Sequence, residues 1–321
     1  MSITVVGPIA FDTVKTPFGE RERMLGGAAV HFALAASFFS DVRVVGPVGD
    51  DFGEEQLDVL RRRGVEVDDV ERVAGGETFF WHGEYGWDLN SRITHDTRLG
   101  VFEGFEPKLS ERSRDSDVLF LANIQPELQL GVRAQLPHAR FVALDSMNLW
   151  IEQTREALVS AIRGVDCLIL NDAELRQLTG KPNLIAAARE VLAWGPEAPE
   201  LRGPSVIVAK QGEYGAALIT REGFFAVPAY PLETVVDPTG AGDTFAGGFV
   251  GYIDAHPQDE LGEDVLRRAM VHATVLASFN VEEFGTTRIE RLTGEEIVGR
   301  LQELRAMTQF SHEGATAENY G

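Results

Sequence analysis

Short, largely apolar runs recur along the chain, and they constrain its fold more than any other feature. They are Ile3–Val6, Val42–Val45, Val118–Leu121, Phe141–Leu144, Cys167–Leu170, Val206–Ala209 and Ala216–Ile219. Runs this short, without polar alternation, are typical of strands covered on both faces of a mainly parallel sheet. Helical composition lies between them, at Ala28–Phe39, Glu54–Arg63, Glu152–Ile162, Asn183–Ala193, Thr244–Ala255 and Glu263–Phe279. The alternation predicts a doubly wound α/β core with helices on both faces.

Two segments, residues 11–22 and 78–100, interrupt this rhythm. Aromatic and polar residues alternate in Thr78–Tyr85, which suits strands with one open face. We expect the two segments to pair as a small β lid over a substrate, standing off a core of residues 1–10, 23–77 and 101–310. An edge hairpin that buries Trp81 and Trp87 in a dimer contact is an equal alternative, and both can hold. Residues 311–321 are polar and predict a flexible tail.

Charge and composition exclude several classes of partner. The formal net charge of −21 argues against nucleic acid and anionic membranes, because both would repel such a surface. The single cysteine, Cys167, lies in an apolar run and allows no intrachain disulfide. We find neither a signal peptide nor a run long enough to span a membrane, and we expect a cytoplasmic protein.

A glycine-broken turn, Asp237–Asp243, leads into the apolar helix that begins near Thr244. The strand-like segments Phe224–Val227 and Leu232–Val236 precede it, which places it where open α/β sheets bind ligands. Its small residues let backbone amides and a helix N-terminus approach a phosphate. The turn matches neither a P-loop nor a dinucleotide fingerprint. A carboxylate there could accept the proton of an attacking hydroxyl, and an N-cap aspartate is the alternative.

Together these motifs resemble the ribokinase/PfkB sugar kinase family. Its two signature regions match Gly26–Ala33 with Val45–Gly53, and Asp237–Gly248, and the resemblance runs from Gly7 to about Gly285. It implies a parallel core with a β lid, ATP as donor and transfer of the γ-phosphate to an alcohol. It also implies that Asp243 is the catalytic base. The residues that match the family's anion hole are Gly240, Ala241 and Gly242.

Two further motifs match the family's nucleotide side. Asn171 and Glu174 resemble its Asn-x-x-Glu motif, which implies that they position Mg²⁺, mostly through water, beside the nucleotide. Read alone, the pair is a helix N-cap with a capping glutamate. Lys210, Gly212 and Gly215 resemble its nucleotide-binding turn, and a plain hairpin turn is the compatible alternative.

Asp237 and Thr239 match positions that contribute to a potassium site in many members of this family. A cation there would offset phosphate charge and order the turn. Thr239, with Gly240 and Gly242, also falls beside the nucleotide in this resemblance. Alternatively, Asp237 only caps the turn.

Matches on the acceptor side are less complete. Asp12 corresponds to the family's sugar-binding aspartate, and Gly26 with Gly27 corresponds to its di-glycine turn. His31 stands where ribokinase-like members usually have asparagine, and Ala10 replaces another asparagine, so ribose itself is doubtful. His31 is read as substrate-binding or as structural, with equal weight.

Two other side chains are candidates for the same pocket. Asn123 lies at a neighbouring strand end, and Arg92 comes from the expected lid. Arg92 could hold the phosphate of a sugar phosphate, and a solvated lid arginine is the alternative.

Our main functional prediction is an ATP- and Mg²⁺-dependent kinase of a sugar or polyol hydroxyl, with potassium as a possible further cofactor. A nucleoside kinase is the nearest alternative, because Phe79, Trp81, Tyr85 and Trp87 of the lid could stack on a base. A non-catalytic sugar-binding regulator with a kinase fold is a third. The resemblance implies a homodimer formed through the lid.

Overall fold

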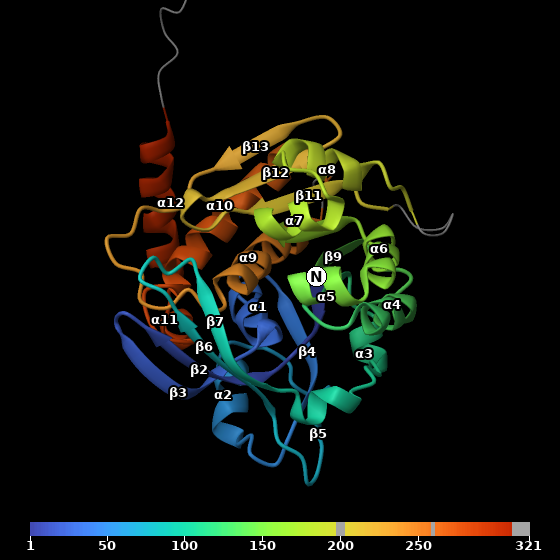
Figure 1. Ribbon diagram of the computed structural model, residues 1–321, viewed down its shortest axis with the longest axis vertical. Coiled ribbons are helices and arrows are strands. Elements are labelled where there is room, and N and C mark those ends of the chain that lie inside the picture. The colour runs from blue at the N-terminus through green and yellow to red at the C-terminus, as the bar shows by residue number, and fades with distance from the viewer. Residues whose placement is uncertain (197–202, 258–260, 310–321) are drawn as a thin grey trace, which may run out of the picture.

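The computed structural model describes residues 1–196, 203–257 and 261–309, and the predicted tail at 311–321 lies outside them. Within these residues the chain forms a nine-stranded sheet, in the order β13-β12-β11-β10-β9-β8-β1-β4-β5, and a four-stranded sheet, in the order β3-β2-β6-β7 (Figure 1). The strands are β1 (Ser2–Val6), β2 (Ala10–Thr16), β3 (Gly19–Gly26), β4 (Asp41–Val48), β5 (Val70–Arg72), β6 (Phe79–Tyr85), β7 (Arg92–Arg98), β8 (Val118–Leu121), β9 (Phe141–Asp145), β10 (Cys167–Asn171), β11 (Val206–Lys210), β12 (Ala216–Thr220) and β13 (Phe224–Val227).

The large sheet is parallel from β5 to β11, and β12 and β13 continue it as antiparallel edge strands. Each of the seven predicted apolar runs is a strand of this sheet. The doubly wound, mainly parallel fold is thereby confirmed. Successive residues of a strand point to opposite faces, so Val118 and Phe120 enter one hydrophobic core while Leu119 and Leu121 enter the other.

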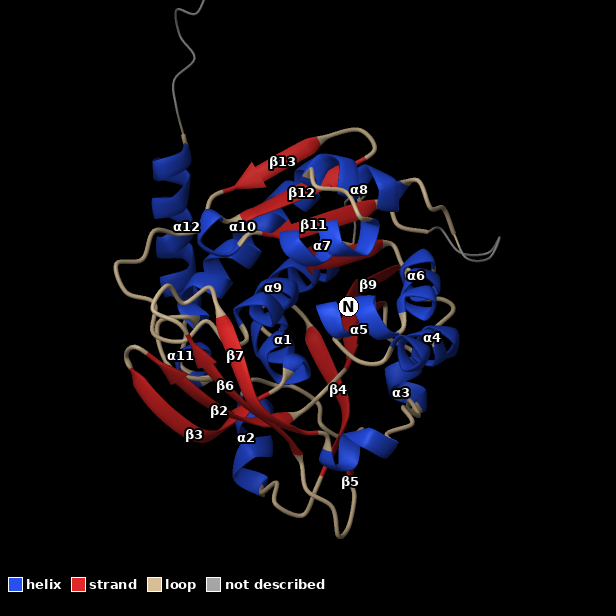
Figure 2. Ribbon diagram, viewed as in Figure 1, coloured by secondary structure: helices blue, strands red, loops and turns tan. Residues whose placement is uncertain are grey.

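Helices cover both faces of this sheet (Figure 2). They are α1 (Ala28–Ala36), α2 (Glu54–Arg62), α3 (Glu111–Arg114), α4 (Pro126–Gln135), α5 (Asn148–Gln153), α6 (Arg155–Arg163), α7 (Asp172–Thr179), α8 (Leu184–Leu192), α9 (Ala241–Ala255), α10 (Glu263–Asn280), α11 (Thr287–Glu290) and α12 (Gly294–Thr308). None of the helices in the described part of the chain is long and apolar enough to cross a lipid bilayer.

The structure corrects two predicted elements. Leu232–Val236 is not a strand: the backbone amides of Val236 and Asp237 donate to the Val281 carbonyl instead of to a neighbouring strand. This segment returns the chain from the edge strand β13 to α9, so no ladder is available to it. The predicted helix Glu152–Ile162 is two helices, because Thr154 has φ −136° and interrupts the helical backbone.

The four-stranded sheet is the predicted small sheet. β2 pairs with β3 antiparallel and with β6 parallel, and β7 completes it antiparallel to β6. The alternation of Phe79–Tyr85 therefore reflects a real strand, with Phe80 and Gly83 buried. Trp87, in the turn after β6, is 91% exposed, so this protomer alone does not bury it.

Helices α1 and α9 pack closely because small residues face each other. A Cβ at Gly247 would overlap the Phe32 carbonyl oxygen and lie 2.9 Å from the Ala35 side chain. All nine residues of α1 are buried, and three of its last four positions are alanines, Ala33, Ala35 and Ala36. The absence of side-chain bulk at Gly247 thus sets how near the two helices lie.

We predict that Gly247→Ala lowers the free energy of unfolding by about 1–3 kcal/mol, because the added methyl must push α1 away from α9. Gly299→Ala in α12 is the matched control, since its Cβ would meet no heavy atom of the described residues within 4 Å. The control should be stabilised by about 0.5–1 kcal/mol through helix propensity. Urea unfolding measures both, and equal stability of the two variants would contradict the prediction.

Candidate active site

A cavity of about 850 Å³ lies between the four-stranded lid sheet and the large sheet. The predicted site residues that line it are Asp12, Gly27, His31, Arg92, Asn123, Asn171, Glu174, Lys210, Thr239, Gly240, Gly242 and Asp243. Five predicted residues are not in its lining: Gly26, Gly212, Gly215, Asp237 and Ala241. Sequence segments more than 200 residues apart thus contribute to one site.

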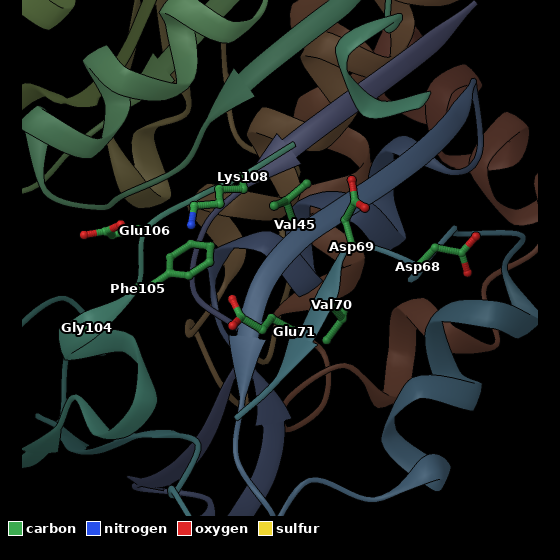
Figure 3. Close-up of a pocket in the computed structure, with 9 residues that line it drawn as sticks. All are labelled: Val45, Asp68, Asp69, Val70, Glu71, Gly104, Phe105, Glu106 and Lys108. Atoms are coloured by element: carbon green, nitrogen blue, oxygen red, sulfur yellow. The ribbon is translucent and has the colours of Figure 1, made fainter. Parts of the chain in front are cut away.

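A second cavity, of about 380 Å³, lies beside β5 and the 3₁₀ helix Gly100–Gly104. Figure 3 shows its lining, in which the side chains of Asp69, Glu71 and Glu106 accompany Lys108 and Phe105. None of the predicted site residues lines it. Of these two cavities, only the larger one is lined by predicted site residues.

The glycine-broken turn forms the N-terminus of α9. Gly240 is the N-cap with φ 74°, a left-handed conformation that favours glycine. The helix starts at Ala241, three residues earlier than predicted, which places Asp243 in its first turn. The Ala241 amide donates to the Pro238 carbonyl at 3.3 Å and so closes the turn itself. An anion at this end of α9 would meet the positive end of the helix dipole.

Asp243 is partly buried, and its pKa is raised to about 7. Removal from water is the main cause, and the nearby Asp145 carboxylate adds to it. Lys210 opposes the shift: its Nζ donates to Asp145 Oδ2 at 2.9 Å. A carboxyl group with a pKa near neutrality can exchange a proton readily at physiological pH.

Asp145 is not among the site residues that the sequence predicts. It ends β9, is 4% exposed and pairs with Lys210 at the end of β11. Its position directly after four apolar strand residues is the signal that could have identified it. The pair places one positive charge among the carboxylates of Asp145, Glu174 and Asp243, and these three raise the pKa of Lys210 against its burial.

Asn171 and Glu174 form a capping box where β10 passes into α7. The Glu174 amide donates to Asn171 Oδ1 at 2.8 Å, and the Asn171 amide donates to Glu174 Oε2 at 2.9 Å. These two hydrogen bonds are those of a helix N-cap with a capping glutamate, which is the alternative interpretation of the motif. Burial, with a contribution from Asp145, raises the pKa of Glu174 to about 7, which favours a cation near it.

These two oxygen donors fit Mg²⁺, which takes one or two protein ligands together with water and phosphate oxygens. No group of three or more His, Cys, Asp or Glu side chains that could hold a metal occurs in the described ranges. Asn171 and Glu174 are thus not part of such a group. Their position is suited to a metal that arrives with a phosphate group.

The predicted nucleotide turn connects β11 to the antiparallel strand β12, as the hairpin alternative requires. Gly215 has φ 102°, and a Cβ there would overlap the Val227 carbonyl oxygen. Asp237 accepts the amides of Thr239 at 2.9 Å and Gly285 at 3.0 Å, so it caps its turn. The nucleotide and potassium roles stay predictions.

The residues predicted to bind the acceptor include two adjoining glycines, Gly26 and Gly27. A Cβ at Gly26 would overlap the Asp12 carboxylate, and one at Gly27 would overlap the Pro8 carbonyl oxygen. Gly27 also has φ 93° as the N-cap of α1. Asp12, on β2, is 6% exposed, and burial together with Asp237 raises its pKa to about 7.

His31 lies one helical turn after Gly27 and is 2% exposed. Its Nδ1 lies 3.1 Å from Asn280 Oδ1, and its ring occupies the space that a Cβ at Gly240 would need. Asn280 also donates from Nδ2 to the Thr239 carbonyl at 2.7 Å. Asn280, fully buried at the end of α10, was not predicted; a lone amide ending an apolar helical stretch was its only signal.

The remaining lining comes largely from aromatic side chains. Phe79, Trp81 and Tyr85 of β6 line the cavity, as does Trp150 of α5. Trp150 Nε1 donates to Asn123 Oδ1 at 2.9 Å, which gives the predicted Asn123 a structural partner. Arg92 is exposed, as its solvated alternative predicts, with its guanidinium carbon 5.5 Å from the Trp81 ring centre.

Known proteins resemble this chain in sequence and in fold. The model of the pfkB family carbohydrate kinases matches residues 3–291. The chain is 30% identical over 277 residues to the cytidine kinase of Thermococcus kodakarensis, covering 84% of this chain and 95% of that protein. It is 34% identical over 276 residues to the deoxyribokinase of Salmonella typhi, covering 81% of this chain and 82% of that protein.

Among solved structures, the nucleoside kinase of Burkholderia thailandensis in complex with inosine superposes with a TM-score of 0.74 at 19% identity. The match covers 95% of this chain and 99% of that one, and it confirms the ribokinase fold. The family resemblance read from the two signature regions is confirmed as well. The chain therefore belongs to the pfkB family of carbohydrate kinases, phosphotransferases that act on an alcohol group.

Proposed function

We propose that this protein transfers the γ-phosphate of ATP to a hydroxyl of a nucleoside, with Asp243 as the general base. The observation that carries the acceptor assignment is the aromatic wall of β6, which lines the same cavity as Asp243. A nucleobase offers such a wall a larger flat apolar surface than does a free sugar or polyol, our first prediction from sequence. The cavity of about 850 Å³ has room for a nucleoside and a phosphate group.

Asp243 suits the role of base by position and by charge. It lies in the first turn of α9, beside the Gly240–Gly242 turn, where a phosphoryl group would be held. The acceptor oxygen attacks the γ-phosphorus and its proton passes to the Asp243 carboxylate, while the bond from the γ-phosphorus to the β-phosphate oxygen breaks. The electron pair of that bond leaves with ADP, so atoms and charge balance.

Two positively charged features lie beside Asp243 and can offset the negative charge of a phosphate group. A Cβ at Gly242 would lie 3.0 Å from Lys210 Nζ, so this ammonium group stands over the turn. Together with the N-terminus of α9 it can stabilise negative charge on the transferred group. Asn171 and Glu174 would hold Mg²⁺, largely through water, which neutralises charge on the nucleotide phosphates when bound.

We predict that Asp243→Asn lowers turnover by about 10²–10⁴-fold while leaving ATP affinity nearly unchanged, because only the proton acceptor is lost. Coupled ADP-release assays measure turnover, and calorimetry with a non-hydrolysable ATP analogue measures affinity. Asp264→Asn is the matched control: it changes an exposed aspartate in the first turn of α10, outside the cavity. Undiminished turnover of Asp243→Asn would refute the assigned role.

The same variant should gain stability at alkaline pH. The pKa of Asp243 is raised from 3.8 to about 7 in the folded state, so the wild type loses stability as pH rises across that window. Asp243→Asn removes this cost, and we predict a gain of about 1–3 kcal/mol near pH 8 that shrinks towards pH 5. Urea unfolding at several pH values gives the difference. A pH-independent difference would show that Asp243 is not destabilised by its surroundings.

The acceptor class is decided by a substrate panel. We predict that purine or pyrimidine nucleosides give kcat/KM at least about tenfold above hexoses, pentoses and inositols, because the base adds stacking on the aromatic wall. Trp81→Ala should remove most of that advantage, and Trp87→Ala, at an exposed position outside the lining, is its control. Preferential turnover of a free sugar would restore our first prediction. Binding without any turnover would favour the non-catalytic regulator.

A further inference from the structure

Asp145 is a buried carboxyl group of the cavity that the proposed reaction does not use. It lines the cavity together with Asp243 and Glu174, and it is 4% exposed. Its Oδ2 accepts a hydrogen bond from Lys210 Nζ at 2.9 Å. An isolated buried charge is costly, so each member of this pair helps to fix the place of the other.

Asp145 itself is held from several directions. Its Oδ1 accepts from the Ser146 amide at 2.8 Å, and its carbonyl accepts from Gln129 Nε2 at 2.9 Å. Gln129 is fully buried and also donates to the carbonyl of Ala122, which follows the neighbouring strand β8. Asp145 is therefore a fixed point for Lys210, whose long side chain has several rotatable bonds.

The ammonium group of Lys210 lies beside the turn that carries Asp243. A Cβ at Gly242, the residue before Asp243, would lie 3.0 Å from Lys210 Nζ. In the described part of the chain, Asp145 is the carboxylate within ion-pair distance of this nitrogen, whereas Asp243 and Glu174 are farther away. All three act on it through space: burial opposes its charge, yet the three carboxylates together raise its pKa. Lys210 is thus near three carboxylates and bonded to one.

Several elements contribute charges near Asp243. Burial is the main cause of its raised pKa, and among the neighbouring charges Lys210 alone is positive and lowers it. A movement of this ammonium group onto Asp243 would therefore change the proposed base directly. The charged groups that act on Asp243 or on its neighbours are Asp12 of β2, Arg92 of β7, Asp145 of β9, Glu174 of α7 and Lys210 of β11.

We propose that Asp145 is a positioning residue that restrains Lys210 and so keeps it from closing onto Asp243. Held at the end of β9, the ammonium group stays beside the Gly240–Gly242 turn, where a phosphoryl group would meet it, and the Asp243 carboxylate stays open to the proton of the acceptor. A carboxylate bonded to an ammonium group takes up a proton less readily, so the restraint preserves the strength of the base. This inference rests on the proposed kinase activity and adds a residue on which that activity depends.

The first experiment measures kcat and KM near pH 8 for the intact protein, with ATP, Mg²⁺ and whichever nucleoside or sugar it phosphorylates best. Asp145→Asn should lower kcat by about 10–100-fold and change KM for the acceptor by less than about threefold, because the base is weakened and the acceptor loses no contact. Asp254→Asn is the matched control. It removes a buried carboxylate that pairs with Arg140 at 2.6 Å near the other end of α9, outside the cavity, and its kcat should stay within about threefold of the wild type.

A double-mutant cycle separates the restraint on Lys210 from the charge of Asp145 itself. The readout is the pKa of Asp243 in carbon-13 spectra of protein labelled at aspartate Cγ, where the Asp243 signal is the one missing from Asp243→Asn. Lys210→Met should raise this pKa in the wild type, and by about 1–3 pH units more in the Asp145→Asn background, where the released ammonium group contacts Asp243. An equal rise in both backgrounds would overturn the inference, because Lys210 would then lie in the same place without Asp145.

Asp145→Asn leaves Lys210 buried without its partner, and that alone can unfold the chain. In that case the wild type supplies the test. A crystal structure with Mg²⁺ and a non-hydrolysable ATP analogue should show Lys210 Nζ bonded to Asp145 and outside ion-pair distance of Asp243. A lysine that has left Asp145 in this complex contradicts the proposed restraint.

Failure of this inference differs from failure of the proposed function. If the protein phosphorylates an alcohol and folded Asp145→Asn keeps the kcat of the wild type, the kinase activity stands and the positioning role fails. If no alcohol is phosphorylated, the proposed function fails, and the catalytic role of Asp145 fails with it whatever the cycle shows. The cycle and the crystal structure need no turnover, so they test the restraint on Lys210 separately.

Discussion

The close packing of α1 against α9 is the constraint on which the rest of the site depends. Each helix begins at a glycine with positive φ, Gly27 for α1 and Gly240 for α9. Gly247 lets the two helices approach until backbone touches backbone, and the first turns then lie side by side. Asp243, in the first turn of α9, and Asp12, on β2 beside the start of α1, line one cavity.

A second property follows from that closeness. Burial, with a smaller contribution from neighbouring carboxylates, raises the pKa of Asp12, Glu174 and Asp243 to about 7 each. The ammonium group of Lys210 opposes this shift at Glu174 and Asp243, and it is itself paired with Asp145. A cation bound beside these carboxylates would favour their ionised forms and lower their pKa values.

Much of the fold could be predicted because its signals are local. Runs such as Val118–Leu121 are apolar throughout since helices cover both faces of the sheet, and the alternation of Phe79–Tyr85 reflects a strand with one open face. Leu232–Val236 also contains residues that favour strands, but no neighbouring strand pairs with it, and only the tertiary structure reveals that. Thr154 likewise breaks a helix at a point where the flanking sequence is uniformly helical.

The candidate site, like the fold, could be predicted from the sequence only where its residues are close together in the chain. Asp243 and the turn before it are adjacent in sequence and were predicted together, whereas Asp145 and Asn280 act through partners far along the chain. His31 and Asn280 are 249 positions apart, yet the orientation of one depends on the other. A substitution at either position would leave the other side chain without this partner. Relatives with histidine at the first position should carry a hydrogen-bond acceptor at the second, and those with asparagine at the first should be free of that demand.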